Sequence, residues 1–473
     1  MFAKDLRDWI ERVDEIGELR RVDGATWQED IGMATELLHH KQGSPVVIFD
    51  NIPGYPQGYR VMVNGYGSYR RIALTLGLPT DIPLPELTQM WRRKVTQIKP
   101  VDPVLVSDGP VMENIKEGDD IDVLAFPTPI WHELDGGRYI GTGSCDITVD
   151  PDEGWVNLGT YRVMVHDAKR VGFYVSPGKH GYIQRNKYLN RGQPCPIAVA
   201  IGVDPLLYLA SASEVPYGIS EYAWAGGVSG EPVPVIKGKY TGLPIPANAE
   251  IVIEGFAPPD LKLMEGPFGE WTGYYASSAR EEPVIEVKAI YHRNNPIIFG
   301  CPPNKPPGEE SHYRAFLRSA FLLDEMEKAG VPDVVNAWCH PVGGSHLLLA
   351  VAIKQRYPGH ARQAGHIAAM CHNGAYLGRY VIVTDEDIDV TDLNEVVWAM
   401  CTRADPAGAI DIIHRALSGP LDPAIHPDHK GFNSRAIIDA CRPYEWKDKF
   451  PPVNEPSPEV RRRALEKWGH LTS

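Results

Sequence analysis

The chain has 473 residues, of which 43% are hydrophobic and 23% charged, and its formal net charge is −14. This composition is typical of a soluble globular protein with two or three domains, and the acidic balance without a dense basic patch argues against a nucleic-acid-binding protein. The seven cysteines occur singly, without a C-x-x-C pair, so we expect reduced thiols in a cytoplasmic protein. Because no run of 18 apolar residues occurs, no stable membrane insertion is expected.

We predict a mixed α/β domain over residues 1–110. Leu6, Trp9, Ile10 and Val13 recur at helical spacing before Gly17, which predicts an amphipathic helix over residues 3–16. Short apolar runs then alternate with helical patterns up to about residue 105. The chain therefore begins with a compact α/β unit.

Residues 111–305 are predicted to form a β-rich, barrel-like domain. Short apolar runs such as "CDITVD", "YRVMVHD", "PIAVAIGVD" and "EIVIEGF" are separated by Gly, Pro and Asp. Strands at this spacing favour a folded antiparallel sheet.

Residues 306–473 are predicted to form a second α/β domain that mediates oligomerisation and ends in a helical tail. A proline-rich stretch at 301–312 marks the boundary, and a helix over 313–330 ends at Gly330. Alternating helical and strand patterns then indicate βαβ units. The tail offers Ser457 as N-cap, Pro458 as first helical residue and Gly469 as terminator. The predicted fold class is thus α+β.

Three short motifs resemble functional signatures but lack an essential residue. "GYGSYR" has Arg70 where a dinucleotide-binding loop requires its third glycine, and "GGVSGE" has Glu231 where a nucleophile elbow requires glycine. "HELDGG" at 132–137 lacks the second histidine of a zinc protease. The sequence therefore favours none of these three chemistries.

The stretch "LMEGPFGEWTGYY" places Glu265 and Glu270 five residues apart. At this spacing the two side chains would not share a face of a helix, and they would point to opposite faces of a strand. A loop curved by Pro267 and the adjacent glycines could direct both carboxylates to one point. A surface turn with two solvated acids is the alternative for this stretch taken alone.

A second irregular segment contains Asn157 and Arg162, also five residues apart and separated by Gly159. A bulge at Gly159 could leave the N–H groups of residues 159–162 free to bind an anion, although an ordinary structural bulge is also consistent. Further along, His180 and Glu221 each follow a turn. Asparagine, histidine and glutamate together offer a mixed ligand set that suits Mn²⁺ or Mg²⁺.

Five segments in order resemble the UbiD family of decarboxylases over nearly the whole chain. They are N-x-G-x-Y-R at 157–162, G-K-H at 178–180, G-x-S-E at 218–221, E-G-P-F-G-E at 265–270 and "YVIVTDEDID…VVWAMCTR" at 380–403. The resemblance implies a reversible, non-oxidative decarboxylase (a lyase) of an aromatic, heteroaromatic or α,β-unsaturated acid. It also implies a covalent substrate adduct with prenylated FMN, Mn²⁺ (or Mg²⁺) and K⁺ (or Na⁺). A flavin prenyltransferase would supply the cofactor, and the enzyme would be a homodimer or homohexamer.

The resemblance also implies roles for individual residues. Asn157, His180 and Glu221 match the metal ligands, and the remaining cofactor contacts match Thr160, Tyr161, Arg162, Lys179 and Arg379. Arg162, Glu265 and Glu270 match a catalytic network in which Glu270 protonates the carbon after CO₂ leaves. Trp155 and the carbonyl groups around residues 210–213 match a monovalent-cation region.

Two other functions are also consistent with the sequence. A metal-dependent hydrolase could employ Asn157, His180 and Glu221 with Glu270 as general base. A catalytically silent assembly protein could retain the fold without turnover.

Overall fold

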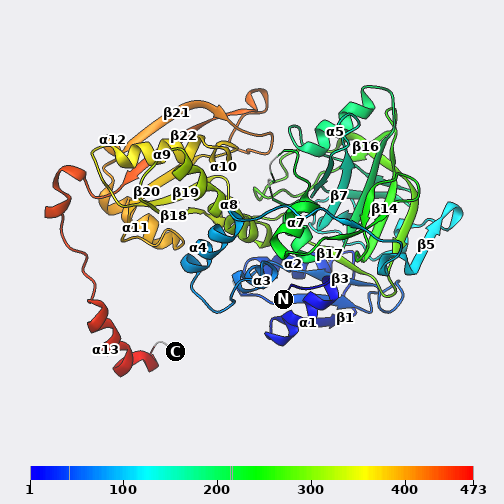
Figure 1. Cartoon of the computed structure of the whole chain (residues 1–473), viewed down its shortest axis with the longest axis horizontal. Helices are drawn as coiled ribbons and strands as arrows, with labels where there is room; N and C mark the ends of the chain where they lie inside the picture. Colours follow the sequence, from blue (N-terminus) through cyan, green and yellow to red (C-terminus); the bar gives the residue numbers. More distant parts are fainter. Residues whose placement is uncertain (1, 42, 214, 216, 472–473) are drawn as a thin grey trace.

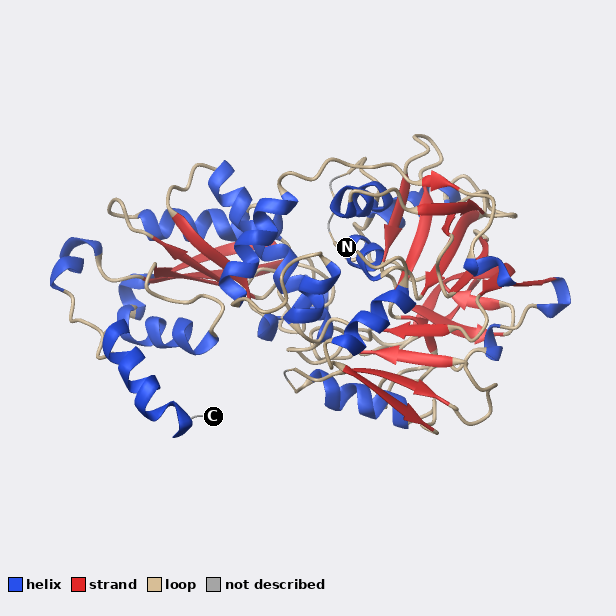
Figure 2. Cartoon of the chain, turned by 60° about the horizontal axis from the view of Figure 1, so that its bottom comes forward, coloured by secondary structure: helices blue, strands red, loops and turns tan. Residues whose placement is uncertain are grey.

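The computed structural model describes residues 2–41, 43–213, 215 and 217–471. Figure 1 shows the C-terminal part of the chain set to one side of the N-terminal and central parts, with the long helix α8 (Glu309–Lys328) between them. Figure 2 shows the strands gathered in two groups, of which the smaller is the C-terminal sheet. The predicted α+β class is confirmed.

The N-terminal part is built on a four-stranded sheet with the strand order β1-β2-β3-β17. Its elements are α1 (Leu6–Glu15), β1 (Leu19–Asp23), α2 (Asp30–His39), β2 (Val46–Asp50), β3 (Arg60–Val63), α3 (Tyr69–Thr75) and α4 (Leu84–Val95). The fourth strand, β17 (Ile297–Gly300), arrives from much later in the chain and pairs in parallel with β3. The predicted first helix is confirmed, because Leu6, Trp9, Ile10 and Val13 form the buried face of α1.

The central part contains a curled, mostly antiparallel sheet with the path β6-β9-β10-β16-β14-β11-β7-β8. Two further strands, β5 and β15, pair with β16. The strands of this region are β4 (Val104–Leu105), β5 (Asn114–Glu117), β6 (Tyr139–Gly141), β7 (Ser144–Val149), β8 (Val156–Gly159), β9 (Val163–Asp167), β10 (Arg170–Gly172), β11 (Cys195–Ile201), β12 (Pro234–Lys237), β13 (Pro244–Pro246), β14 (Ile251–Ala257), β15 (Lys262–Glu265) and β16 (Arg280–His292). This curled sheet matches the predicted barrel-like domain.

Three helices interrupt the central sheet: α5 (His180–Leu189), α6 (Pro205–Ser211) and α7 (Glu221–Ser229). The sequence patterns predicted turns and strands here. Every residue of α6 is buried, as are most residues of α7. A helix that is apolar on all sides carries no amphipathic period, and this explains why the pattern did not show it.

The C-terminal part contains a five-stranded sheet with the order β18-β19-β20-β22-β21. Its remaining elements are β18 (Val334–Cys339), β19 (Leu348–Ile353), α9 (His360–Met370), α10 (His372–Ala375), β20 (Tyr380–Asp385), α11 (Leu393–Arg403), α12 (Pro406–Ala409), β21 (Ile410–Leu417), β22 (Phe432–Ala440) and α13 (Pro458–Trp468). The predicted βαβ pattern is confirmed for β19, α9 and β20, which form a parallel pair joined by a helix, while the chain from β20 to the parallel strand β22 passes through α11, α12 and β21. Short 3₁₀ helices occur at Pro110–Glu113, Gly118–Asp120, Val123–Ala125, Pro341–Gly343, Pro427–His429, Tyr444–Lys449 and Gly469–Leu471.

The tail helix α13 extends away from the sheets in Figure 1, and all its residues are exposed. As predicted, the Ser457 side chain caps it by accepting a hydrogen bond from the Val460 N–H.

A continuous hydrophobic core holds α8 against the remainder of the chain. The ring centroids of Trp91 in α4 and Phe316 in α8 lie 6.5 Å apart, and Trp91 also meets Trp224 of α7 at 6.0 Å. All seven cysteines are free, as predicted. In the part of the chain that the structure describes, none of the helices combines the length and apolar character of a membrane span.

Candidate active site

The guanidinium of Arg162 lies between the carboxylates of Glu265 and Glu270. Its Nε and Nη2 each donate to one oxygen of Glu265 at 2.8 Å, a bidentate arrangement. Its Nη1 donates to Glu270. With Glu265 and Glu270 only 1% and 7% exposed, the network is buried, so the two acids do not belong to a solvated surface turn.

Irregular backbone brings these three residues together. Arg162 precedes β9, Glu265 is the last residue of β15, and Glu270 follows in the connecting loop. Gly266 adopts φ +86°, a value that favours glycine, where the chain leaves β15. Glycine and proline thus give this loop the tight curvature that the sequence predicted.

The segment "HELDGG" supports this loop. The backbone N–H of Gly269 donates to Asp135 at 2.9 Å, and the N–H of Gly136 donates to the Pro267 carbonyl at 2.8 Å. A Cβ atom at Gly269 would lie 2.8 Å from Nδ1 of His132, so only glycine fits. A segment that lacks the zinc-protease pattern therefore binds the backbone of the loop that carries the two acids.

Aromatic rings enclose the arginine. The Arg162 guanidinium lies 4.1 Å from the ring centroid of Tyr174 and 5.4 Å from that of Phe268. Buried Tyr139 donates its hydroxyl to Glu265 at 3.1 Å. Stacking and hydrogen bonding fix the guanidinium and exclude water from it.

The sequence interpretation missed Tyr139 and Tyr174 as parts of this site. No local signal in the sequence distinguishes a core tyrosine from one that contacts a catalytic group.

Burial and neighbouring charges shift the pKa values of Glu270 and Arg162 in this network. Burial raises the pKa of Glu270 to about 7 although Arg162 opposes the shift, and the nearby carboxylates of Glu310 and Glu265 add to it. Burial disfavours the charge on Arg162, but the attraction of Glu270 and the hydrogen bonds to Glu265 outweigh it and raise the pKa of Arg162. Glu270 is therefore able to hold a proton near neutral pH beside a permanent cation.

The predicted metal ligands gather around β8. Asn157 lies in β8, His180 is the first residue of α5, and Glu221 is the first residue of α7. The hydroxyl of Tyr161 accepts hydrogen bonds from Asn157 Nδ2 at 3.5 Å and from the Gly181 N–H at 3.1 Å. This hydroxyl thereby links the strand that carries Asn157 to the helix that begins with His180.

Glu221 is anchored from the same strand. Its Oε2 accepts from the Leu158 N–H at 2.7 Å. Burial raises the pKa of this carboxyl to about 8. On the other side, the His180 ring packs against Trp155 with centroids 4.9 Å apart.

The backbone N–H groups after Gly159 are not all free. Tyr161 N–H donates to the buried carboxyl of Asp146 at 2.9 Å, so an internal acid occupies a position that the sequence suggested for a bound anion. Burial raises the pKa of Asp146 to about 8. The neighbouring Thr160 is partly buried between β8 and β9.

The side chains of Lys179 and Arg379 both have partners in the C-terminal part of the chain. Lys179 precedes α5, and its Nζ lies 5.9 Å from the ring centroid of Tyr376. The guanidinium of Arg379 is paired with both oxygens of Asp422, one of them at 2.7 Å. The structure thus brings Lys179 to the C-terminal part, whereas the charge of Arg379 is already neutralised there.

The donor set suits a divalent cation of the Mn²⁺ or Mg²⁺ type. Among the described residues no three His, Cys, Asp or Glu side chains form a metal-binding group. The predicted set is of a different kind, because it combines an amide oxygen with one imidazole and one carboxylate. His180 and Glu221 also lie at the N-terminal ends of α5 and α7, where the helix dipoles favour phosphate.

The Trp155 carbonyl, part of the predicted monovalent-cation region, is a poor ligand for an additional ion. The Trp155 carbonyl oxygen accepts from the Asp150 N–H at 2.8 Å and from Gln184 at 3.2 Å, and these two donors use both of its lone pairs. We therefore assign no step to an ion at Trp155.

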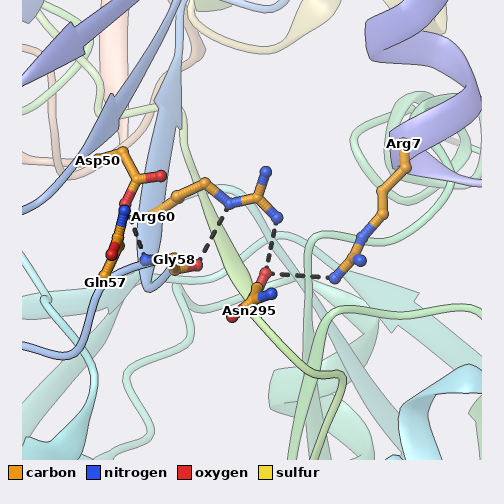
Figure 3. Close-up of a pocket in the computed structure, with 6 residues that line it drawn as sticks. All are labelled: Arg7, Asp50, Gln57, Gly58, Arg60 and Asn295. Carbon is orange, nitrogen blue, oxygen red and sulfur yellow. Dashed lines mark hydrogen bonds between the residues drawn. The ribbon is translucent and has the colours of Figure 1, made fainter.

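A surface cavity of about 590 Å³ lies apart from these residues, at the edge of the N-terminal sheet. Figure 3 shows the guanidinium groups of Arg7 and Arg60 directed toward Asn295, whose carbonyl oxygen accepts from both. None of the lining residues belongs to the Arg162 network or the Asn157 cluster. The cavity is therefore separate from the predicted catalytic residues.

Comparisons with known proteins agree with the predicted resemblance. Models of the 3-octaprenyl-4-hydroxybenzoate carboxy-lyase match in three segments: the N-terminal domain at 10–91, the Rift-related domain at 104–306 and the C-terminal domain at 311–440. A pyrrole-2-carboxylic acid decarboxylase from Pseudomonas aeruginosa is 31% identical, with 98% of each chain covered.

Solved structures agree over the whole chain. Vanillic acid decarboxylase from Sedimentibacter hydroxybenzoicus, in its open form, superposes with a TM-score of 0.88, 30% identity and full coverage of both chains. An evolved dimeric form of the UbiD-class enzyme HmfF from Pelotomaculum thermopropionicum, in complex with prFMN, has a TM-score of 0.83 and 28% identity, with 96% and 98% of the two chains covered. The chain belongs to the UbiD family of decarboxylases.

Proposed function

We propose that the protein catalyses the reversible, non-oxidative decarboxylation of an aromatic, heteroaromatic or α,β-unsaturated carboxylic acid with the help of prenylated FMN. The observation that carries the proposal is the buried Arg162 guanidinium held between Glu265 and Glu270. Such a group offers a cation for a substrate carboxylate and a proton donor beside it.

Arg162 is the residue that binds and orients the substrate carboxylate. A guanidinium forms two parallel hydrogen bonds to a carboxylate. Because Glu265 holds Nε and Nη2 of Arg162 and Glu270 accepts from Nη1, the second N–H groups of Nη1 and Nη2 would bind the substrate carboxylate. Glu265 thus acts as a positioning residue for the arginine.

Glu270 supplies the proton that replaces CO₂. Breaking the bond between the carbon and its carboxylate leaves an electron pair on the carbon, and that pair must capture a proton. With its pKa raised to about 7, the Glu270 carboxyl can be protonated before this step and ionised after it. Arg162 then stabilises the carboxylate that forms, until solvent returns the proton.

The chain contains a group of residues that would suit the cofactor. Prenylated FMN supplies the electron sink that a side chain cannot provide for an electron pair on an sp² carbon. Asn157, His180 and Glu221 would hold its phosphate through Mn²⁺ or Mg²⁺, and the Gly181 N–H bound to Tyr161 fixes the first turn of α5 at this place. The prFMN complex of HmfF supports the choice of cofactor.

Two partners follow from the proposal. Prenylated FMN requires a flavin prenyltransferase as supplier, and the dimeric form of HmfF supports a homo-oligomer.

The decisive experiment compares Glu270→Gln with Glu133→Gln, which removes an exposed acid from the supporting segment. Both variants are produced together with a flavin prenyltransferase, and CO₂ release from a panel of aryl, heteroaryl and acrylic acids is measured. We expect Glu270→Gln to retain the flavin absorption spectrum and to lose turnover by at least about 10²-fold, the range of general acid catalysis. Glu133→Gln should match the wild type. Full activity of Glu270→Gln would refute the role of Glu270, and absence of a bound flavin from the wild type would refute the proposed function.

A further inference from the structure

Several buried polar atoms near the start of α8 have no partner within the described chain. They include Oε2 of Glu310 and Nε of Arg314 in α8, and Nδ2 of Asn304 in the segment before it. Folded proteins seldom bury polar atoms without a hydrogen-bond partner, because each such atom is costly. A group of them in one region indicates a place that receives a polar ligand.

Glu310 has one oxygen committed and one available. Its Oε1 pairs with Nη2 of Arg314 at 2.6 Å, one helical turn further along α8, and the Glu310 side chain is only 13% exposed. The pairing fixes the orientation of the carboxyl group, so Oε2 is directed elsewhere with no donor among the described residues. An oxygen held in this way presents its lone pairs in fixed directions.

The segment that leads into α8 packs against the loop that carries Glu270. A Cβ atom at Gly273 would lie 3.0 Å from both Cα and Cβ of Lys305, so the two backbones touch. Glu310 also acts on the Glu270 carboxyl as a nearby negative charge. The available oxygen of Glu310 therefore lies within electrostatic reach of the proposed proton donor.

We propose that Glu310 is a specificity-determining residue whose Oε2 accepts a hydrogen bond from a donor group on the substrate ring, remote from the carboxylate that Arg162 binds. This inference rests on the proposed function and narrows its substrate class. The preferred acids carry a ring hydroxyl or a ring N–H, as in hydroxybenzoates or pyrrole carboxylates. Arg314 is the positioning residue for Glu310.

The same geometry disfavours two other kinds of acid. A ring without a donor leaves Oε2 unpaired when water is excluded, and sites built around a hydrogen bond discriminate strongly against ligands that lack it. A dicarboxylic acid would bring a second negative charge against Glu310. We expect an order of kcat/KM in which donor-bearing acids lead, donor-free acids follow about 10- to 100-fold lower, and dicarboxylic acids come last.

Glu310→Gln tests the inference in the flavin-loaded enzyme. Glutamine has nearly the same shape, and with its oxygen toward Arg314 it would present an N–H donor where glutamate presents an acceptor. Asp324→Asn is the matched control, because Asp324 pairs with Lys328 four residues further along the same helix. Two ring pairs serve as probes: 4-hydroxybenzoate against benzoate, and pyrrole-2-carboxylate against furan-2-carboxylate.

We expect Glu310→Gln to abolish the preference for the donor-bearing member of each pair, while the flavin spectrum stays unchanged and Asp324→Asn behaves as the wild type. Equilibrium binding of the same acids, followed by tryptophan fluorescence, should show the same loss of preference without relying on turnover. If the wild type binds the acids selectively but releases no CO₂, the proposed function fails while the inference stands. An equal effect of Glu310→Gln on both members of each pair, or a shifted pH profile with unchanged preference, would overturn the inference, since Glu310 would then act only on the proton of Glu270.

Discussion

Gly344 lies directly against the indole of Trp271, so that a Cβ atom at Gly344 would be 2.3 Å from Cε3 of that ring. Trp271 follows Glu270 in the active-site loop, and Gly344 belongs to the C-terminal part, after β18. The indole ring also meets His346 with centroids 5.1 Å apart. The loop that carries Glu270, the proposed proton donor, thus contacts the C-terminal part through Trp271.

Replacement of Gly344 by alanine should disturb the active-site loop. Gly344 has φ +60°, and Gly118 has the same φ but open space within 4 Å of the position a Cβ atom would take, so Gly118→Ala carries the backbone strain without the clash. We expect Gly344→Ala to lower kcat by about tenfold or more through a displaced Trp271, since small misplacements of catalytic groups are costly. Steady-state kinetics of the two variants, with thermal unfolding to compare their stability, will measure this. Equal kinetics for both would show that the contact with Trp271 does not matter for turnover.

The pH dependence of decarboxylation should report the ionisation of Glu270. Since burial raises its pKa to about 7, the protonated form predominates below that value and disappears above it. A proton donor is active only in its protonated form, so kcat should fall as the pH rises through about 7. A rate that rises over the same interval would show that Glu270 acts as a base in the rate-limiting step. Stopped assays of CO₂ release on both sides of this pKa will distinguish the two.

Removal of the Arg162 charge should destabilise the fold in a pH-dependent manner. Arg162→Ala leaves Glu265 and Glu270 buried without their cation, and breaking a buried ion pair costs about 3–5 kcal/mol. The folded state then favours protonated carboxyl groups, so their contribution is present at low pH and is lost as the pH rises. We expect a greater loss in the free energy of unfolding at about pH 8 than at about pH 5, measured by urea denaturation.

Arg170→Ala is the control for this experiment, because the Arg170 and Asp167 side chains are 41% and 38% exposed. Exposed ion pairs contribute at most about 1 kcal/mol. A similar loss of stability for both arginine variants would contradict the assignment of a special role to the buried network.

The Tyr161 hydroxyl should matter for cofactor retention. Tyr161→Phe removes the acceptor of the Gly181 N–H at the start of α5 and one of the acceptors of Asn157 Nδ2. We expect the purified variant to contain less flavin and less Mn²⁺ than the wild type, with a stability loss of about 1–3 kcal/mol for the unsatisfied groups. Absorption spectroscopy and metal analysis will measure this, with Tyr188→Phe on the same helix as the control. Full occupancy in Tyr161→Phe would show that the hydroxyl does not organise the site.

The sequence predicted those parts of the fold whose signals are local. Alternating apolar runs located most central strands, and helical spacing with clear end signals located α1 and α13 within a few residues. The helices α6 and α7 escaped prediction because burial on all sides removes the polar face from which helical periodicity is recognised.

In the candidate active site, too, residues with a local sequence signal could be predicted and those without one could not. Glu265, Arg162 and Glu270 could be grouped because unusual glycine and proline spacing marked two segments, and a family resemblance linked them. Asp146 and Tyr139 could not, because each contacts a partner outside its own strand, and such tertiary contacts leave no trace in the local pattern. The roles of the grouped residues, and those of His180 and Arg379, stay predictions that the experiments above address.

The pairing of β17 with β3 constrains how the protein is made. β3 ends at Val63, while β17 spans Ile297–Gly300. During synthesis the first three strands must wait for more than two hundred further residues to emerge before their sheet is complete. For most of that time β3 presents an open edge, which favours mispairing with other chains. A nascent chain of this protein should consequently depend on a chaperone until the ribosome has passed residue 300, and an N-terminal fragment expressed alone should aggregate.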